Sequence, residues 1–274
     1  MNALMEKLHF VQVEESDGIV TVRLNRPGTR NAFNPPLVAE LCEVFQELRG
    51  RGDVRVVLLS GAGSMFCAGM DLKWVMTAQH HSEAQRLQTA EHIMAMYQTI
   101  FDCPVPLVGR IQGGAFGGGV GLVACCDVVV AAEDTQFAFR EVRLGMVPAI
   151  IAPYILRKLG FSQASRYCLT GEGFSAAEAK RIGLVHEVVP AQDLDSRVQS
   201  LTQELFRIGP LAGRETKKLF RQLLELPEEE QGVWCAQTNA RVCGTDEAQE
   251  GFQAFFEKRS PAWATEFPGG QATK

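Results

Sequence analysis

The sequence lacks the features that would place it with membrane or nucleic-acid-binding proteins. It has no long apolar run, since its least polar stretch, residues 113–132, is rich in glycine and contains Asp127, which argues against a membrane span. It also lacks a basic excess, with 27 Lys and Arg against 32 Asp and Glu and a net charge of −5. These two absences predict no membrane partner and no nucleic-acid partner.

Motifs for metals, disulfides and nucleotide phosphates are missing as well. The eight cysteines form no CxxC pair, and the five histidines form no HExxH motif. No Walker A loop occurs, and no GxGxxG loop with a later acidic partner occurs. Residues 1–10 lack the apolar segment of a secretory signal, so we expect a cytoplasmic protein. Because the metal-binding motifs are missing, we also expect no bound metal.

The chain is long and apolar enough to form a large folded core. It has 274 residues, of which 46% are hydrophobic, and a chain of this length buries roughly 75% of its unfolded surface. Strand-like runs alternate with helical patterns such as the one that follows Pro35. This alternation predicts an α/β fold with right-handed crossovers. The predicted strands span residues 10–13, 19–24, 54–59, 106–111 and 128–132.

The last third of the chain has a different pattern. From about Ser175 it reads as successive helices with one short strand signal at residues 185–189. Residues 175–178 predict a capping box, and Gly209 with Pro210 predicts a further helix start. The helix predicted over residues 246–258 has an apolar face that must pack against the core or another subunit. We therefore divide the chain into residues 1–200 and residues 201–274.

Two glycine-rich turns carry the first signal of chemistry. Residues 61–71 follow the strand that ends at Leu59, and residues 112–121 follow the strand that ends at Ile111. Such positions, at the carboxyl ends of sheet strands, are where open α/β sheets bind ligands. Because each turn leads into a helix, the two could direct two backbone N–H groups at one oxygen, as in an oxyanion hole.

The three consecutive glycines at 117–119 need an explanation of their own. Glycines in turns are often only turn residues. A glycine within a helix, however, costs roughly 1 kcal/mol, so three at a helix start favour a close approach of the backbone to a ligand.

Glu141 is the candidate for proton transfer. It follows a short apolar strand and precedes Leu144 and Gly145. Apolar neighbours raise the pKa of a carboxyl and suit it to proton transfer near neutral pH. The alternative is a surface ion pair with Arg140 or Arg143.

These motifs together make the chain resemble the crotonase superfamily, the enoyl-CoA hydratase/isomerase proteins, from about Leu8 to Pro261. The resemblance implies the crotonase (ClpP-like) fold of repeated ββα units. It places the CoA site and both oxyanion loops in residues 1–200, and a helical trimerisation region that closes the site in residues 201–274. The matching segments are residues 25–33, 66–71, 113–119, 126–127, 141, 144–145 and 179–185.

The resemblance also assigns roles to single residues. It implies that the N–H groups of Met70 and Gly118 hold the thioester oxygen and that Glu141 is the acid and base. It implies an acyl-CoA substrate, no metal or other cofactor, and a homotrimer or a hexamer built from two trimers. The residues it implies for binding CoA are Arg30, Ala32, Ala68, Asp71, Phe255 and Lys258.

One departure from the family pattern leaves the reaction open. The second glutamate of the standard hydratases corresponds to Gly121 in this chain. The residues are therefore compatible with a hydratase and with a Δ3,Δ2-enoyl-CoA isomerase that uses Glu141 alone. A non-catalytic CoA-binding homologue is a third alternative. Candidates for a second polar group are Glu91, His92 and Tyr97. Residues 141–153 resemble hydratases of branched glutaconyl-CoA in leucine or terpene breakdown. A distal carboxylate would then need a cation from Lys73, Arg86, Arg140 or Arg143.

Overall fold

The computed structural model describes residues 1–264 and divides into two compact units. The first unit contains Met1–Cys103 and Leu107–Val198, and the second contains Pro104–Pro106 and the chain from Gln199 onward. The last ten residues of the region predicted at 201–274 lie outside the described residues. Within residues 1–264, no helix has both the length and the apolar character to cross a membrane.

A six-stranded sheet forms the centre of the first unit. Strands β1 and β2 are antiparallel, and every later pairing in this sheet is parallel, as the alternation of strands and helices predicts. The predicted strand boundaries are confirmed to within a few residues. The strands, in their order across the sheet, are β1 (Val11–Ser16), β2 (Ile19–Leu24), β3 (Val56–Gly61), β4 (Leu107–Ile111), β6 (Val128–Ala132) and β9 (Glu187–Val189).

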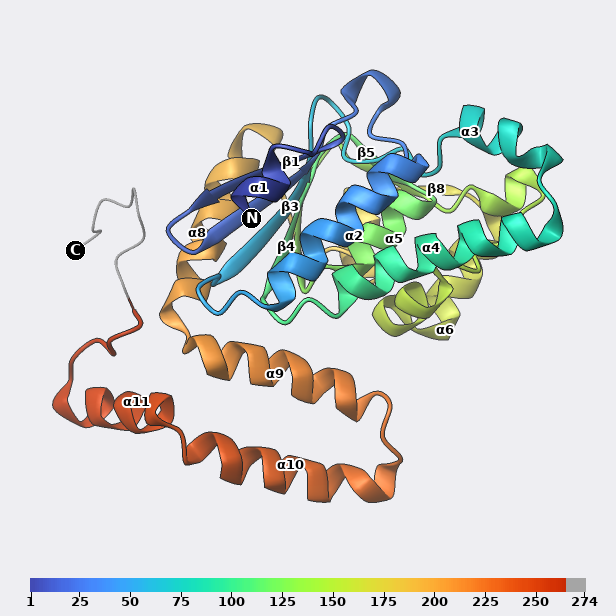
Figure 1. Cartoon of the computed structure of the whole chain (residues 1–274). Helices are drawn as coiled ribbons and strands as arrows, with labels where there is room; N and C mark the ends of the chain where they lie inside the picture. Colours follow the sequence, from blue (N-terminus) through green and yellow to red (C-terminus); the bar gives the residue numbers. More distant parts are fainter. Residues whose placement is uncertain (265–274) are drawn as a thin grey trace. The chain divides into compact units, whose positions relative to one another are not determined.

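Helices pack beside one another against this sheet (Figure 1). Helix α2 contacts α4, α4 contacts α5, and α5 contacts α6. Helix α2 buries six apolar residues at helical spacing, and α6 is interrupted at Gly160, whose φ is +68°. The helices of this unit are α1 (Asn2–Met5), α2 (Pro35–Arg49), α3 (Leu72–Thr77), α4 (Glu83–Phe101), α5 (Gly118–Cys125), α6 (Ala152–Thr170) and α7 (Ala176–Arg181).

A second, three-stranded sheet was not predicted from the sequence. It consists of β5 (Gly114–Phe116), β7 (Gln136–Ala138) and β8 (Gly173–Ser175). Strand β5 lies inside the second glycine-rich turn, which we predicted to be a loop. Three-residue strands with glycine show no usable alternation of polar and apolar residues. This small sheet supports the segment that leads into α5.

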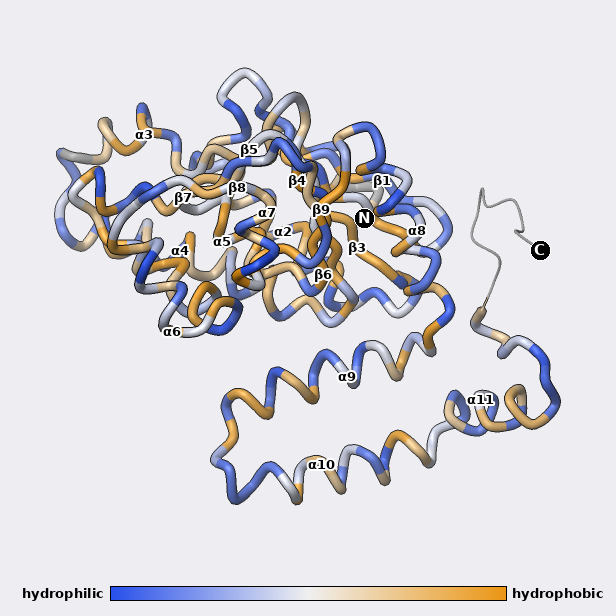
Figure 2. The backbone as a smooth tube through the Cα atoms, turned by 180° about the vertical axis from the view of Figure 1, so that it is seen from behind, coloured by the Kyte–Doolittle hydropathy of each residue, from blue (hydrophilic) through white to orange (hydrophobic). Residues whose placement is uncertain are grey.

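The second unit consists of helices. Helix α8 (Leu194–Arg207) leads into it, and α9 (Pro210–Leu223), α10 (Glu228–Cys243) and α11 (Asp246–Glu257) follow. The Glu247 carboxylate accepts hydrogen bonds at 2.8 Å from the N–H groups of Leu211 and Ala212. Figure 2 shows hydrophobic and hydrophilic residues interspersed along α9, α10 and α11. The apolar face predicted for the last helix is exposed, with Phe255 and Phe256 at 77% and 80%.

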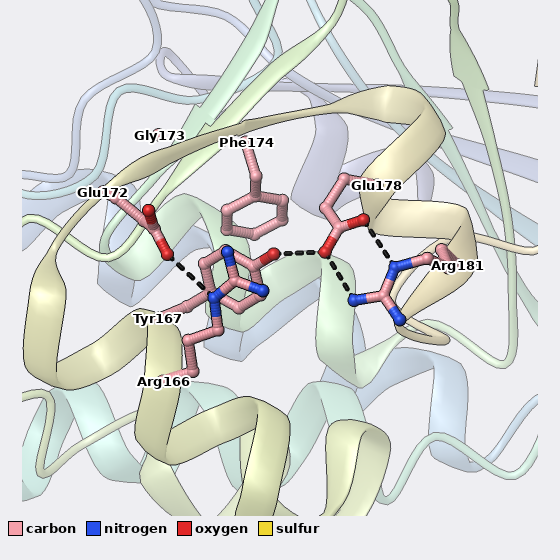
Figure 3. Close-up of a pocket in the computed structure, with 7 residues that line it drawn as sticks. All are labelled: Arg166, Tyr167, Glu172, Gly173, Phe174, Glu178 and Arg181. Carbon is pink, nitrogen blue, oxygen red and sulfur yellow. Dashed lines mark hydrogen bonds and ion pairs between the residues drawn. The ribbon is translucent and has the colours of Figure 1, made fainter.

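The capping box predicted at residues 175–178 forms only in part. Ser175 Oγ accepts the N–H of Glu178 at 3.2 Å, so Ser175 caps α7. The Glu178 carboxylate bonds instead to the Arg181 guanidinium and the Tyr167 hydroxyl (Figure 3). A charged partner three residues away competes with the backbone N–H that a capping box uses.

Candidate active site

Three segments pair through their backbones at the carboxyl end of the main sheet. Residues 30–33 pair with the first glycine-rich turn, since the Phe33 N–H donates to the Gly69 carbonyl at 2.7 Å and the Ala68 N–H to the Arg30 carbonyl at 2.9 Å. On the other side of this turn, the Phe116 N–H donates to the Cys67 carbonyl at 3.0 Å. Both glycine-rich turns are therefore fixed to each other.

Asn31 ties these segments together from inside. It is fully buried, and its amide nitrogen donates to the carbonyls of Ala62, Met65 and Phe66 at 2.8–3.1 Å. Its amide oxygen accepts the N–H of Arg26 at 2.9 Å. Asn31 also has φ +56°, a conformation that asparagine tolerates better than most residues. Residue spacing alone does not predict this role for Asn31, because a single asparagine near a glycine usually indicates only a turn.

Met70 and Gly118 supply two unused backbone donors. Phe33 and Met70 form an isolated β-bridge. Its two hydrogen bonds run from the Phe33 N–H to the Gly69 carbonyl and from the Asp71 N–H to the Phe33 carbonyl, so the N–H of Met70 takes no part in the bridge. Gly118 is the first residue of α5, where N–H groups have no partner within the helix. Within residues 1–264, neither N–H donates a hydrogen bond, and both residues line the same cavity.

The glycines at 117–119 allow close packing of the protein on itself. A Cβ on Gly118 would lie 2.7 Å from Phe33 Cε2, and one on Gly119 would lie 2.4 Å from the Cys67 carbonyl oxygen. The expectation that these glycines admit a ligand is therefore incomplete, because the groups nearest to the missing side chains belong to the chain itself. Gly117 has φ +49°, which a residue with a side chain rarely adopts.

Glu141 faces the same place from the short 3₁₀ helix Glu141–Leu144, just after β7. Its Oε1 lies close to Gly117, at 3.1 Å from the position that a Cβ would take if this glycine carried a side chain. Its Oε2 is buried without a hydrogen-bond partner among the described residues. Burial raises the pKa of Glu141 above its ordinary value, and two backbone hydrogen bonds only partly oppose this shift. The alternative ion pair with Arg140 or Arg143 does not form within residues 1–264.

Met70, Gly118 and Glu141 are brought together where two cavities adjoin. The larger cavity, of about 440 Å³, and the smaller one, of about 60 Å³, are both lined by these three residues. The larger cavity also has apolar walls, to which Leu72, Phe116, Leu144 and Met146 contribute. An apolar cavity with a few converging polar groups is typical of a ligand site.

The residues predicted to bind CoA fall into separate groups. Arg30 and Ala68 line the larger cavity. Ala32 is buried and accepts a hydrogen bond from Arg26, which also pairs with Asp71 at 3.0 Å. Although burial acts in the opposite direction, bonds from Arg26 and from the backbone lower the pKa of Asp71. Asp71 also caps α3, so both residues have a structural role in the frame of the site.

The other two predicted CoA contacts lie in the second unit. Phe255 belongs to α11 and is largely exposed. Lys258 follows this helix in a left-handed conformation with φ +55°.

The charge around the larger cavity favours an anionic ligand. Arg30, Arg140 and Arg143 line it, with Glu141 as the only carboxylate in its lining. Arg140 donates to the Gly171 carbonyl at 3.5 Å and lies over a phenylalanine ring, which holds its guanidinium in place. Of the four cations considered for a distal carboxylate, Lys73 and Arg86 are not in this lining.

The position of the second glutamate is crowded, so a side chain there would displace its neighbours. A Cβ on Gly121 would lie 2.4 Å from Ile151 Cγ2 and 2.9 Å from Tyr97 Cε1. Of the candidates for a second polar group, Tyr97 lines the smaller cavity, and Glu91 and His92 do not. Glu141 is thus the one carboxylate at this site among the described residues.

A further hollow of about 460 Å³ lies between α6 and α7. Figure 3 shows that its charges neutralise one another: Arg166 pairs with Glu172 at 3.0 Å, and Arg181 pairs with Glu178 at 2.6 Å. These pairs leave no unbalanced charge to attract a ligand, so the chemistry is assigned to the cavities at Glu141.

Comparisons with known proteins establish the family of the chain. The family described as enoyl-CoA hydratase/isomerase matches residues 14–266. A putative enoyl-CoA hydratase from Thermus thermophilus is 32% identical over 92% of this chain and 99% of its own. An (E)-benzylidenesuccinyl-CoA hydratase from Thauera aromatica is 31% identical over 92% of this chain and 98% of its own length. The crystal structure of an enoyl-CoA hydratase from Shewanella pealeana superposes with a TM-score of 0.91 at 32% sequence identity. The match covers 96% of this chain and 98% of that one.

The chain belongs to the enoyl-CoA hydratase/isomerase family. Its α/β architecture is the crotonase fold, and it is an enzyme of the enoyl-CoA hydratase type. The resemblance drawn from the sequence motifs is thereby confirmed at the level of family and fold.

The tether at Asn31 gives the first prediction. Asn31→Ala should lower the free energy of unfolding by about 3 kcal/mol, because buried carbonyls left without donors cost about 1–3 kcal/mol each and relax in part. Chemical denaturation measures this loss. Asn34→Ala is the matched control, since Asn34 caps α2 and its removal should cost only about 1 kcal/mol. Equal losses in the two variants would contradict the assigned role of Asn31.

Proposed function

We propose that this enzyme adds water across the 2,3 double bond of an acyl-CoA thioester at the junction of the two cavities. The observation that carries the proposal is the convergence of three groups: the unused N–H groups of Met70 and Gly118, and the partly buried Glu141. Two donors and one acid–base group are the minimum that this addition needs.

The two N–H groups act on the thioester oxygen. Negative charge develops on that oxygen when a nucleophile attacks C3, and donors that are already in place stabilise it without reorganisation. The dipole of α5 adds a positive potential at its first residue, Gly118. Loss of one donor of this kind typically raises the barrier by about 3–4 kcal/mol.

Glu141 moves the proton. In its ionised form it takes one proton from water while the water oxygen bonds to C3, and the electrons of the double bond move toward the thioester oxygen. The protonated Glu141 then delivers a proton to C2 as the enolate collapses. The net result is addition of one water molecule, with Glu141 again ionised. The raised pKa of Glu141 suits both halves of this cycle.

A single carboxylate also suits the second candidate, a Δ3,Δ2-enoyl-CoA isomerase. That reaction needs only the transfer of a proton between C4 and C2, and with Gly121 in place of a second glutamate, Glu141 is the one carboxylate that lines the two cavities among the described residues. The hydratase is favoured here because curated relatives covered over nearly their whole length carry hydratase or dehydratase names, and both names describe the addition or removal of water.

The substrate class follows from the cations of the larger cavity. We infer a branched glutaconyl-CoA, as in leucine or terpene catabolism, whose distal carboxylate meets Arg140 or Arg143. Arg30 remains for the phosphates of CoA. A relative named for a benzylidenesuccinyl-CoA, whose acyl group is that of a dicarboxylic acid, supports an acidic acyl group. The chemistry calls for no cofactor beyond the CoA of the substrate, and a cytoplasmic location stays a prediction.

A homotrimer or hexamer is proposed for the assembly. The support is the exposed apolar face of α11, with Phe252 at 56% and Phe255 and Phe256 more exposed still. Burying one such side chain is worth about 1.5–3 kcal/mol, so an isolated chain leaves a considerable driving force for association unused. Phe255 and Lys258 would then contact CoA at a subunit boundary.

Glu141→Gln tests the reaction. Its hydration of crotonyl-CoA should fall by about 100-fold to 10,000-fold, the usual contribution of an acid–base residue, while thioester binding stays close to normal. The fold should be no less stable at neutral pH. Folding raises the pKa of Glu141 above the ordinary value of about 4.3 for a glutamate. The contribution of Glu141 to the stability of the fold is therefore lost as the pH rises from that ordinary pKa through the raised pKa.

Two measurements follow for this variant. Steady-state kinetics gives the loss of turnover, and thermal unfolding at pH 4 and pH 8 gives the stability difference, which should shift in favour of the variant at the higher pH. Turnover at the wild-type level would rule out Glu141 as the proton carrier.

Arg143→Gln tests the substrate class. Loss of a hydrogen bond to a charged group is worth about 1.5–3 kcal/mol, so kcat/KM for a glutaconyl-type CoA ester should fall by about 10-fold to 100-fold. The value for crotonyl-CoA, which has no distal carboxylate, should change little. Lys73→Gln, outside the cavity lining, serves as the control. Equal losses with both esters would show that Arg143 serves CoA and not the acyl group.

Phe252→Asp combined with Phe255→Asp tests the assembly. The two charges should shift the wild-type trimer or hexamer to smaller species and weaken CoA affinity at the same time, as light scattering and ligand titration would show. Phe161→Asp introduces the same charge at another phenylalanine that is 79% exposed, and should leave the assembly intact. A fully active wild-type monomer at nanomolar concentration would refute the proposed assembly.

A further inference from the structure

Tyr97 is a buried tyrosine whose hydroxyl reaches the active site from α4. Its exposed fraction is 1%, and its hydroxyl donates to the Gly118 carbonyl at 2.6 Å. The ring packs edge-on against Phe33, with centroids 6.3 Å apart, and against Tyr154 at 5.6 Å. These contacts fix both the ring and its oxygen.

Tyr97 also fills part of the space that a side chain at residue 121 would need. Its Cε1 would lie 2.9 Å from a Cβ on Gly121. Tyr97 lines the smaller cavity together with Gly118 and Glu141. Among the described residues, Tyr97 is therefore the other residue with a polar side chain in the lining of the cavity that contains Glu141, next to the position at which the standard hydratases have a second glutamate.

The hydrogen-bonding capacity of the two groups is complementary to a water molecule. The Tyr97 hydroxyl gives its only hydrogen to the Gly118 carbonyl, which leaves its oxygen able to accept a hydrogen bond. Glu141 Oε2 has no partner among the described residues and can accept another. The cavity, at about 60 Å³, has room for a water, since one water needs about 10–15 Å³ of such space and at least two polar partners.

Burial keeps Tyr97 in the form that this arrangement requires. Burial raises the pKa of Tyr97 above its ordinary value of about 10, and the neighbouring Cys67, Cys125 and Glu141 shift it in the same direction. The phenol therefore keeps its proton at neutral pH, and its bond to the Gly118 carbonyl persists.

We propose that Tyr97 replaces the missing second glutamate by holding the attacking water between its phenol oxygen and Glu141. The water then donates one hydrogen to each oxygen, and its lone pair is directed at C3 of the substrate bound at Met70 and Gly118. During the addition the water proton on the Glu141 side is transferred, and Tyr97 neither gains nor loses a proton. This role rests on the proposed hydratase function.

The competing explanation is that Tyr97 only positions the first turn of α5. In that case its loss would disturb the Gly118 N–H and with it every step that depends on the polarised thioester. A role in holding water affects only the step that consumes water. The two explanations therefore differ in which reactions of the same active site should slow down.

Tyr97→Phe separates them, because the ring and its packing stay in place. The kcat for hydration of crotonyl-CoA should fall by about 10-fold to 100-fold, as expected for one lost hydrogen bond to a reacting group. Exchange of the α-protons of butyryl-CoA in heavy water, which needs the two N–H groups and Glu141 but no attacking water, should stay within about twofold of the wild type. Tyr154→Phe, which removes a neighbouring hydroxyl outside the cavity lining, should change neither rate.

Three outcomes would overturn the proposal. Unchanged hydration in Tyr97→Phe would show that the phenol holds no reacting water. A parallel fall of hydration and α-proton exchange would assign Tyr97 to positioning the loop alone. The third outcome concerns the wild-type enzyme. If it exchanges α-protons and moves double bonds but never adds water to crotonyl-CoA or to a glutaconyl-type CoA ester, the proposed hydratase function is wrong. The first two outcomes would contradict only the role of Tyr97 and would leave the hydratase function intact.

Discussion

The site depends on the hydrogen bonds that hold three backbone segments at fixed spacing. The buried Asn31 amide bonds to carbonyls of the first glycine-rich turn, and that turn pairs with residues 30–33 on one side and with β5 on the other. These bonds use up the neighbouring backbone groups and leave the N–H groups of Met70 and Gly118 without partners within residues 1–264. The proposed oxyanion hole is therefore a product of backbone pairing, and its donors need no side chain of their own.

Close packing around this pairing also restricts the chemistry. Gly118 and Gly119 permit contact with Phe33 and Cys67, and Gly121 is similarly crowded, since a Cβ there would press on Ile151 and Tyr97. In the proposed reaction, the single carboxylate, whose pKa is raised by burial, takes part in both proton transfers. The second polar contact to water then has to come from an uncharged group. This is the physical basis for assigning that contact to Tyr97.

The sequence predicted the parts of the fold that rest on local pattern. The apolar runs of the main sheet, the helix after Pro35, the two glycine-rich turns and the position of Glu141 after a short strand were all evident. The sheet of β5, β7 and β8 was not, because three-residue strands carry no periodicity. The structural role of Asn31 was not predicted, and Tyr97 was predicted only as one of three candidates for a second polar group, since the contacts that distinguish these residues lie 21 to 35 positions away in the chain. Such long-range contacts leave no mark in residue spacing.

The central claim is that this enzyme adds water to an enoyl thioester with a single carboxylate, which carries both proton transfers, and with two backbone donors on the thioester oxygen. Incubation of the wild-type enzyme with crotonyl-CoA in ¹⁸O-labelled heavy water, followed by mass spectrometry and NMR of the product, tests it most directly. The account predicts ¹⁸O at C3 and one solvent deuterium at C2. Deuterium incorporation with migration of the double bond and no ¹⁸O at C3, found also with a glutaconyl-type CoA ester, would contradict it.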